Sequence, residues 1–289
     1  MLSFLASLPS PTIGRLSIGP VGLSAYGLMI ALGVVAGTAL ASKRFEQAGG
    51  GSGEELQGVA TWSVVGGLIG ARLYHVATTW DQFADDLWRI PMVWKGGLGI
   101  PGGLLGGIIV GVYVVHRRGL ELPTVLTAAA PGIALAQAIG RWGNWWNQEL
   151  FGRPTGLPWG LEIADDKTPA GFGDAVLFHP TFLYESLWNL GLCVVLVAID
   201  RYRPLRPGRL FAVYLAGYFA GRFWIEGLRI DPTHTIGALR LNQWVALVVV
   251  TGALVFLAVD ARRNRRHRDD GSHGGAARSL LGDASPSQR

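Results

Sequence analysis

Residues 140–154, GRWGNWWNQELFGRP, place a group of polar side chains directly after the apolar run 126–140. The group holds one guanidinium, two amides and one carboxylate: Arg141, Asn144, Asn147 and Glu149. Side chains of these types bind anions and hydroxyl groups through several hydrogen bonds at once. An aromatic belt at a membrane surface accounts for the three tryptophans between them, but not for the polar residues. The spacing therefore predicts a ligand site at the mouth of an apolar helix.

The composition of the chain is that of a membrane protein. Of 289 residues, 49% are hydrophobic and 16% are charged, whereas about a quarter are charged in an ordinary soluble domain. Apolar runs of about 20 residues recur, and such a run crosses a bilayer as a helix. We predict an all-α polytopic protein with about seven spans, at roughly 22–42, 57–77, 96–116, 122–141, 180–200, 208–228 and 238–260.

Basic residues follow alternate predicted spans, so the net charge of +5 marks topology and does not indicate nucleic-acid binding. The clusters are Lys43 and Arg44, Arg117 and Arg118, the four arginines of 201–209, and those of 262–268. The positive-inside rule then puts the N-terminus outside and the C-terminus in the cytoplasm. We expect a membrane-embedded domain over 1–261 with an outer-face loop at 142–178, and a disordered basic tail over 262–289.

Metal and disulfide chemistry are not expected. Cys193 is the single cysteine and lies in an apolar run, and the six histidines show no ligand spacing. The glycine-rich runs around 66–72 and 96–111 are typical of close helix packing. A weaker expectation is that Pro101 breaks the third span and exposes backbone amides to a cavity.

Three arginines, Arg72, Arg141 and Arg222, lie in or at the edge of apolar spans, where each charge costs a few kcal/mol. The stretch YFAGRFWIE puts Tyr218, Arg222 and Glu226 on one helical face, because they are four residues apart. One interpretation is an ion pair that joins two helices.

The carboxylates at similar depth, Glu185 and Glu226, with Glu149 near the surface, are too few by this count to neutralise all three arginines. We therefore expect surplus positive charge facing outward. Phosphate suits a guanidinium best, and the abundant phosphate of a membrane is a lipid headgroup. Arg72 suits either a structural pair or a second lipid contact.

Residues 140–152 resemble the signature of the bacterial prolipoprotein diacylglyceryl transferases. The matching positions are Gly140, Arg141, Gly143, Asn144, Asn147, Glu149 and Gly152. Three further pieces are similar to the same family in the same order: AYGLMIALG with Tyr26, HPTFLYES with His179 and Glu185, and YFAGRFWIEGLR with Tyr218, Arg222, Glu226 and Arg229.

The resemblance implies transfer of the diacylglyceryl group of phosphatidylglycerol to the lipobox cysteine of preprolipoproteins, without metal or cofactor. It implies a bacterial cytoplasmic membrane location with the site on the outer side of the bilayer. Catalysis would fall to Arg141, Arg222 and Glu226. The residues that would bind phosphatidylglycerol are Arg141, Tyr26, Asn144, Glu149, Gly152 and Tyr218.

One position departs from the family pattern. Many members carry a histidine in an H-G-G motif early in span three, and here Pro101 takes that place and has no proton acceptor. Three side chains are left as possible bases, Glu226, Glu149 and His179, or the positive site alone produces the thiolate. His179 also suits a hydrogen-bonding role at a helix entry.

A transporter for an anionic solute is the alternative function, since intramembrane arginines and glycine-rich helices suit it too. It predicts paired polar breaks in the two halves of the chain. The GLGIPGG run of the first half has no counterpart in the second.

Overall fold

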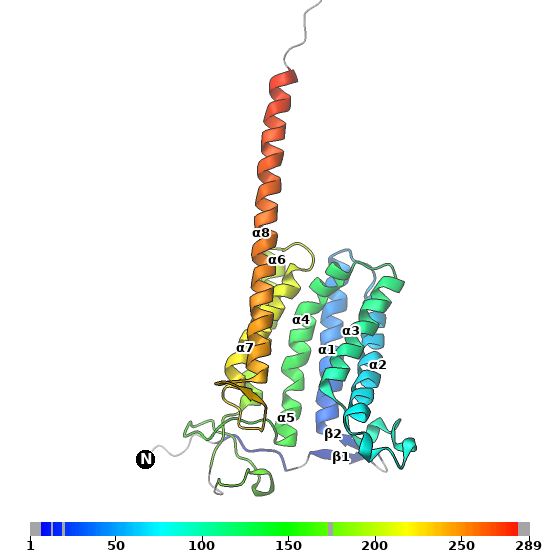
Figure 1. Ribbon diagram of the computed structural model, residues 1–289, viewed down its shortest axis with the longest axis vertical. Coiled ribbons are helices and arrows are strands. Elements are labelled where there is room, and N and C mark those ends of the chain that lie inside the picture. Colours follow the sequence, from blue (N-terminus) through cyan, green and yellow to red (C-terminus); the bar gives the residue numbers. More distant parts are fainter. Residues whose placement is uncertain (1–6, 13, 19–20, 173–175, 283–289) are drawn as a thin grey trace, which may run out of the picture.

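A computed structural model describes residues 7–12, 14–18, 21–172 and 176–282. Most of this part is helical, and its long helices stand side by side in one bundle (Figure 1). The long helices are α1 (Ala25–Gln47), α2 (Gly53–Thr78), α3 (Ile100–Arg117), α4 (Leu122–Gly140), α6 (Thr181–Tyr202), α7 (Arg209–Glu226) and α8 (Leu241–Gly282). A short helix, α5 (Trp142–Asn147), follows α4 directly.

Each predicted span coincides with one of these long helices. Five are long and apolar enough to cross a membrane: α1, α3, α4 together with α5, α6, and the 241–263 part of α8. Glutamates, arginine and histidine in α2, and arginines and glutamate in α7, lower their apolar character. The polytopic helical class is confirmed in this form, and the count of seven crossings stays a prediction.

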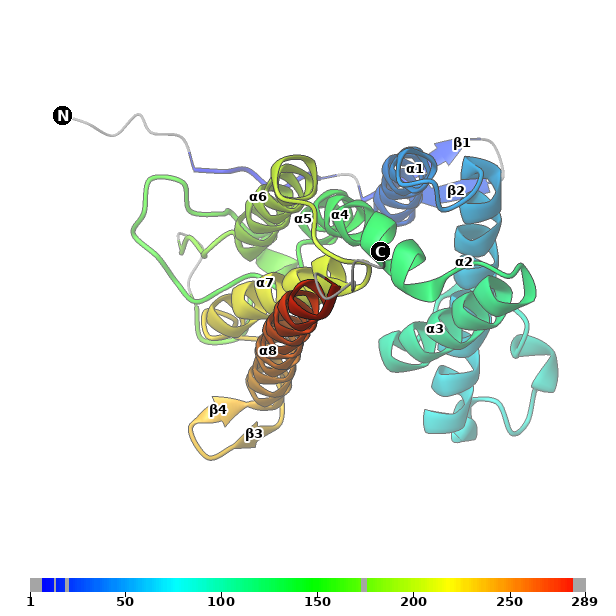
Figure 2. The same cartoon turned by 90° about the horizontal axis from the view of Figure 1, so that it is seen from above.

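Glycines let the helices of the first half pack backbone to backbone. A Cβ built on Gly37 of α1 would lie 2.5 Å from the carbonyl oxygen of Gly132 on α4, and the reverse contact is 2.3 Å. Gly70 of α2 and Gly102 of α3 approach each other in the same way, at 2.3 Å. Viewed from above, α2 and α3 lie on one side, α6, α7 and α8 on the other, and α4 lies between (Figure 2). The expected small-residue packing is therefore present.

The expected break at Pro101 is absent, because this proline is in the first turn of α3. Gly99 is the N-cap residue, and the helix runs without interruption from Ile100 to Arg117. Proline is tolerated at this position, where its missing N–H has no partner in the helix anyway. The sequence prediction was wrong because it began the helix at 96.

Basic residues gather at one end of the bundle, at the ends of α1 and α3 and between α6 and α7 (Figure 1). Arg44 binds Asp200 of α6 at 2.7 Å, and Arg209 of α7 binds Asp260 of α8. Beyond this end, α8 continues as a helix to Gly282. The disordered basic tail over 262–289 stays a prediction, and residues 283–289 lie outside the described part.

The opposite end of the bundle carries the irregular segments. They include two hairpins, β1 (Arg15–Ile18) with β2 (Val21–Ser24) and β3 (Thr235–Ile236) with β4 (Leu239–Arg240). Three 3-10 turns, η1 (Trp80–Gln82), η2 (Leu87–Arg89) and η3 (Val93–Lys95), connect α2 to α3. The predicted loop 142–178 contains α5 and the turn η4 (Asp165–Lys167), and its residues 173–175 are outside the described part. An all-α prediction did not include the hairpins.

Candidate active site

Glu185, in the first turns of α6, contacts two arginines from two other helices. Its Oε2 atom lies 2.6 Å from Nη2 of Arg141, the C-cap residue of α4. Nη1 of Arg222 on α7 donates to both carboxylate oxygens at 3.0 Å. The Glu185 side chain is 3% exposed, while those of Arg141 and Arg222 are 20% and 14% exposed. One buried carboxylate thus joins the ends of α4, α6 and α7, and leaves part of each guanidinium accessible.

Glu226, the last residue of α7, is enclosed by four nitrogen-bearing groups. On one oxygen, Arg222 Nη2 donates at 2.7 Å and Arg229 Nη1 lies at 3.6 Å. On the other, Asn242 Nδ2 donates at 3.1 Å and Arg240 Nε lies at 3.1 Å. Because the residue has no exposed surface, no side of the carboxylate is open to a substrate thiol. In this geometry, Glu226 positions the guanidinium of Arg222.

The polar residues after α4 are brought together by a sharp change of chain direction. Gln148 and Leu150 adopt left-handed backbone angles, φ 52° and 60°, which are uncommon outside glycine. They turn Glu149 back toward α5, where its Oε1 accepts from Nδ2 of Asn144 at 2.9 Å and of Asn147 at 3.3 Å. Arg141 Nη1 reaches Asn144 Oδ1 at 3.4 Å. The predicted group of 140–149 is therefore one connected cluster.

Two tyrosines border the arginines. Tyr26, at the start of α1, packs on Gly143, where a Cβ would lie only 2.6 Å from its ring. Arg141 and Glu149 are the charged groups that act on its hydroxyl. Tyr218 lies one helical turn before Arg222 and stacks on the ring of Tyr214, with centroids 5.9 Å apart.

Gly152 and His179 belong to a neighbouring layer of extended chain. Gly152 pairs with Arg229, and a Cβ on it would lie 2.8 Å from the Cβ of His179. Only glycine fits this crossing of chain segments. His179 Nδ1 is 3.1 Å from the Tyr184 hydroxyl, which also accepts from Trp159 Nε1 at 3.1 Å. Burial, and then the charge of Arg153, lower the pKa of His179 below its ordinary value.

The ion-pair network in the structure has other members than those that the sequence predicts. The network of ion pairs around Glu185 and Glu226 contains, in the described residues, four guanidiniums and three carboxylates: Arg141, Arg222, Arg229 and Arg240, with Glu185, Glu226 and Asp231. Asp231 and Arg240 come from the segment around the β3–β4 hairpin, which the sequence analysis did not connect to this site. This network carries a surplus of one positive charge.

Arg72 has a structural partner. Its Nε and Nη atoms donate to backbone carbonyls of the segment between α2 and α3, at Arg89, Ile90, Gly96 and Gly97. Its guanidinium also lies over the ring of Phe83, 5.1 Å from the centroid. Of the two roles left open for Arg72, the structure thus provides a structural one, with backbone carbonyls in place of a carboxylate.

Apolar helices with a buried cluster of arginines and carboxylates at one end define a polytopic helical membrane protein with a polar site. The chain belongs to the prolipoprotein diacylglyceryl transferase family, whose model matches residues 14–259. The resemblance inferred from the motifs is thereby confirmed.

Three relatives illustrate the similarity, each named a phosphatidylglycerol–prolipoprotein diacylglyceryl transferase. Transferase 2 of Streptomyces coelicolor is 48% identical to this chain, over 90% of this chain and 83% of its own length. That of Cutibacterium acnes is 47% identical over 89% and 88%. That of Mycobacteroides abscessus is 43% identical over 88% and 78%.

Replacing Glu226 by glutamine is expected to destabilise the fold. The change removes the negative charge that three guanidiniums share and leaves only Glu185 and Asp231 to compensate them. Removing one partner of a buried ion pair costs about 3–5 kcal/mol. Thermal unfolding of the purified protein in detergent measures the effect. The control is Glu54→Gln on the exposed side of α2. Equal unfolding temperatures for both variants would contradict the structural role of Glu226.

The imidazole of His179 is expected to titrate below its ordinary pKa of 6.5. Because protonation is opposed in the fold, His179 stays neutral above its lowered pKa and gains charge only at more acidic pH. Histidine NMR on the labelled protein gives the midpoint, with His179→Gln to assign the signal. Replacing Arg153 by glutamine removes the positive charge that helps to lower the pKa of His179, and should therefore raise the midpoint of the titration. A midpoint at or above 6.5 in the unmodified protein would contradict this description.

Proposed function

We propose that this protein transfers the diacylglyceryl group of phosphatidylglycerol to the lipobox cysteine thiol of preprolipoproteins and releases glycerol phosphate. The observation that carries the proposal is the pair of partly accessible guanidiniums of Arg141 and Arg222, held by Glu185 at the end of apolar helices. Family membership supports the transferase over the transporter.

In the reaction, the cysteine thiolate attacks the diacylglyceryl carbon that carries the phosphate. A carbon–sulfur bond forms, and the carbon–oxygen bond to phosphate breaks with its electron pair on oxygen. Negative charge therefore grows on the phosphate of the leaving glycerol phosphate. Two guanidiniums fixed at that point stabilise the charge as it develops, in the manner of oxyanion-hole donors. Arg141 and Arg222 take this role.

Glu185 holds the guanidiniums of Arg141 and Arg222 next to each other, on one carboxylate, before the lipid binds. A phosphate oxygen that enters between them takes over part of the hydrogen bonding that the carboxylate now receives. Phosphate matches the planar guanidinium as well as carboxylate does. Asn144, Glu149 and Tyr26 surround Arg141, and Tyr218 borders Arg222, so these residues would orient the phosphate and the glycerol hydroxyls. Gly152 would act by letting the neighbouring segments approach closely.

The thiol proton needs an acceptor. Glu226 is enclosed on both oxygens, which favours the other candidates. His179 is held neutral by its lowered pKa, as a proton acceptor must be, and Glu149 is exposed. The guanidiniums also lower the pKa of a thiol that approaches them and so increase its thiolate fraction.

The proposed setting is the bacterial cytoplasmic membrane, crossed by all seven long helices. The basic end of the bundle would face the cytoplasm, as the positive-inside rule requires. The polar site, at the opposite end, would face outward, where the signal peptide of a translocated preprolipoprotein presents its cysteine. The outer-face segments 142–178 would then border the entry of this substrate.

Replacing Arg141 or Arg222 by alanine is expected to lower kcat/KM by about 10²–10³-fold, the usual effect of removing one charge-stabilising donor. The assay follows transfer of a labelled diacylglyceryl group from phosphatidylglycerol to a synthetic lipobox peptide. Arg117→Ala, exposed at the basic end of the bundle, is the matched control and should retain activity.

The same assay with phosphatidylethanolamine should give little product, because its headgroup carries an ammonium that the surplus guanidinium charge repels. Normal turnover in either arginine variant would overturn the phosphate role. Equal use of both lipids would overturn the choice of headgroup.

A further inference from the structure

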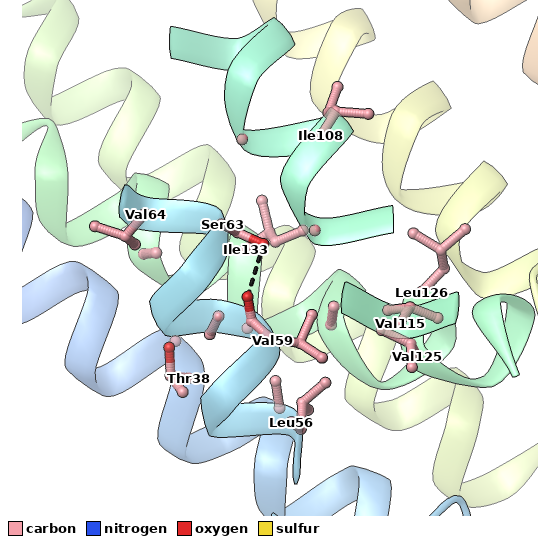
Figure 3. Close-up of a pocket in the computed structure, with 18 of the residues that line it drawn as sticks. Thr38, Leu56, Val59, Ser63, Val64, Ile108, Val115, Val125, Leu126 and Ile133 are labelled. Carbon is pink, nitrogen blue, oxygen red and sulfur yellow. Dashed lines mark hydrogen bonds between the residues drawn. The ribbon is translucent and has the colours of Figure 1, made fainter. Parts of the chain in front are cut away.

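A cavity of about 430 Å³ lies among α1, α2, α3 and α4, and Phe211 of α7 also contributes to its wall (Figure 3). Apolar side chains and glycines form nearly all of its wall. The hydroxyl residues on the wall are Thr38 and Ser63, and Ser63 already donates to the carbonyl of Val59 at 2.8 Å. The wall thus provides almost nothing for a polar ligand, while its volume falls in the range of ligand pockets.

The cavity leads toward the candidate active site. On α4, the wall residues Val125, Ala129, Ile133 and Ala136 follow one helical face, and Arg141 is the residue that ends this helix. At about 1.5 Å per residue, the wall runs from about 8 Å to about 24 Å below Arg141 along the helix axis.

On α1, the wall residues Val34, Thr38 and Ala41 belong to a face that continues toward the helix start, two turns away at Tyr26. Tyr26 itself packs on Gly143, next to Asn144. Two helices therefore carry the same apolar surface from the cavity up to the polar cluster.

A packed group of buried side chains borders the far end of the cavity. Leu56, Val115 and Val125 line the cavity and also belong to this hydrophobic cluster, together with Phe45, which has no exposed surface. A chain that enters from the polar cluster would reach this floor near the basic end of the bundle. The floor thus sets a limit on length.

We infer that this cavity receives one fatty acyl chain of the phosphatidylglycerol substrate and sets an upper limit on its length, an inference that rests on the proposed function. The substrate's chain is the occupant we favour, because the faces of α4 and α1 that line the cavity end at Arg141 and Tyr26, beside the polar cluster proposed to bind the phosphate of the same molecule. A lipid of the surrounding bilayer that never reacts is the competing occupant, and the experiment separates the two.

Ala129 offers the sharpest test, because it lines the cavity midway and its side chain is small. Ala129→Phe fills the wall about 18 Å below Arg141, so a long chain loses its space and a short one does not. The matched control is Val194→Phe on α6, which is 60% exposed and is not among the wall residues. Initial rates are measured with phosphatidylglycerols of eighteen-carbon and ten-carbon chains.

In Ala129→Phe, the ratio of kcat/KM for the long lipid to that for the short lipid should fall about tenfold, because an overfilled pocket excludes the longer chain. Val194→Phe should leave the ratio unchanged. Ala129→Leu should give a smaller fall in the same direction, and it decides the matter if the phenylalanine variant does not fold. An unchanged ratio in a folded Ala129 variant, or an equal loss for both lipids, would overturn the inference.

A second measurement is independent of turnover. Mass spectrometry of phosphatidylglycerol that copurifies with Ala129→Phe should show shorter chains than with the unmodified protein, and the same chain lengths would contradict the inference. If the unmodified protein transferred no diacylglyceryl group from any phosphatidylglycerol, the proposed function would fail, while the copurified lipids would still report on the cavity.

Discussion

The contact of one buried carboxylate with two arginines is the interaction on which the site depends. Glu185 binds Arg141 and Arg222 together, and so fixes the ends of α4, α6 and α7 relative to one another. Without it, two guanidiniums at the edge of the membrane would repel each other and lack a partner. A buried ion pair contributes little net stability, since desolvation offsets the attraction. The geometry is better understood as preparation for an anion than as a stabilising device.

The two halves of the bundle differ in their contacts: the first is apolar and rich in glycine, and the second carries ion pairs. Glycines bring α1 to α4 and α2 to α3 at backbone contact, and the apolar cavity remains between these four helices. The other half carries its charges in closed contacts: Glu226 joins α7 to Arg240 and to Asn242 of α8. Arg141, on the central helix α4, borders both halves. A phospholipid has the same division, with a charged head and hydrocarbon chains, and this correspondence underlies the proposed function.

Much of this organisation follows from the sequence, because apolar length and motif spacing are local properties. The long helices were located by their apolar runs, and Arg141, Asn144 and Glu149 meet as their spacing predicts. The sharing of Glu185 was not predicted, since its partners lie in other helices and contacts between helices leave no local pattern.

Other features depend on chain geometry that the sequence pattern does not show. Arg240 precedes an apolar span and resembles a topology signal, yet the hairpin before α8 turns it toward Glu226. Pro101 reads as a helix breaker unless the helix start is known to lie at Ile100. The roles of the site residues in catalysis stay predictions, because geometry identifies which side chains are accessible and not which of them react.

The most direct test is a structure of the protein with bound phosphatidylglycerol at a resolution that locates the phosphate. We expect phosphate oxygens within about 3.2 Å of guanidinium nitrogens of both Arg141 and Arg222, with the Glu185 contacts lengthened or shared. A phosphate bound elsewhere, with both arginines still fully engaged by Glu185 and Glu226, would contradict it.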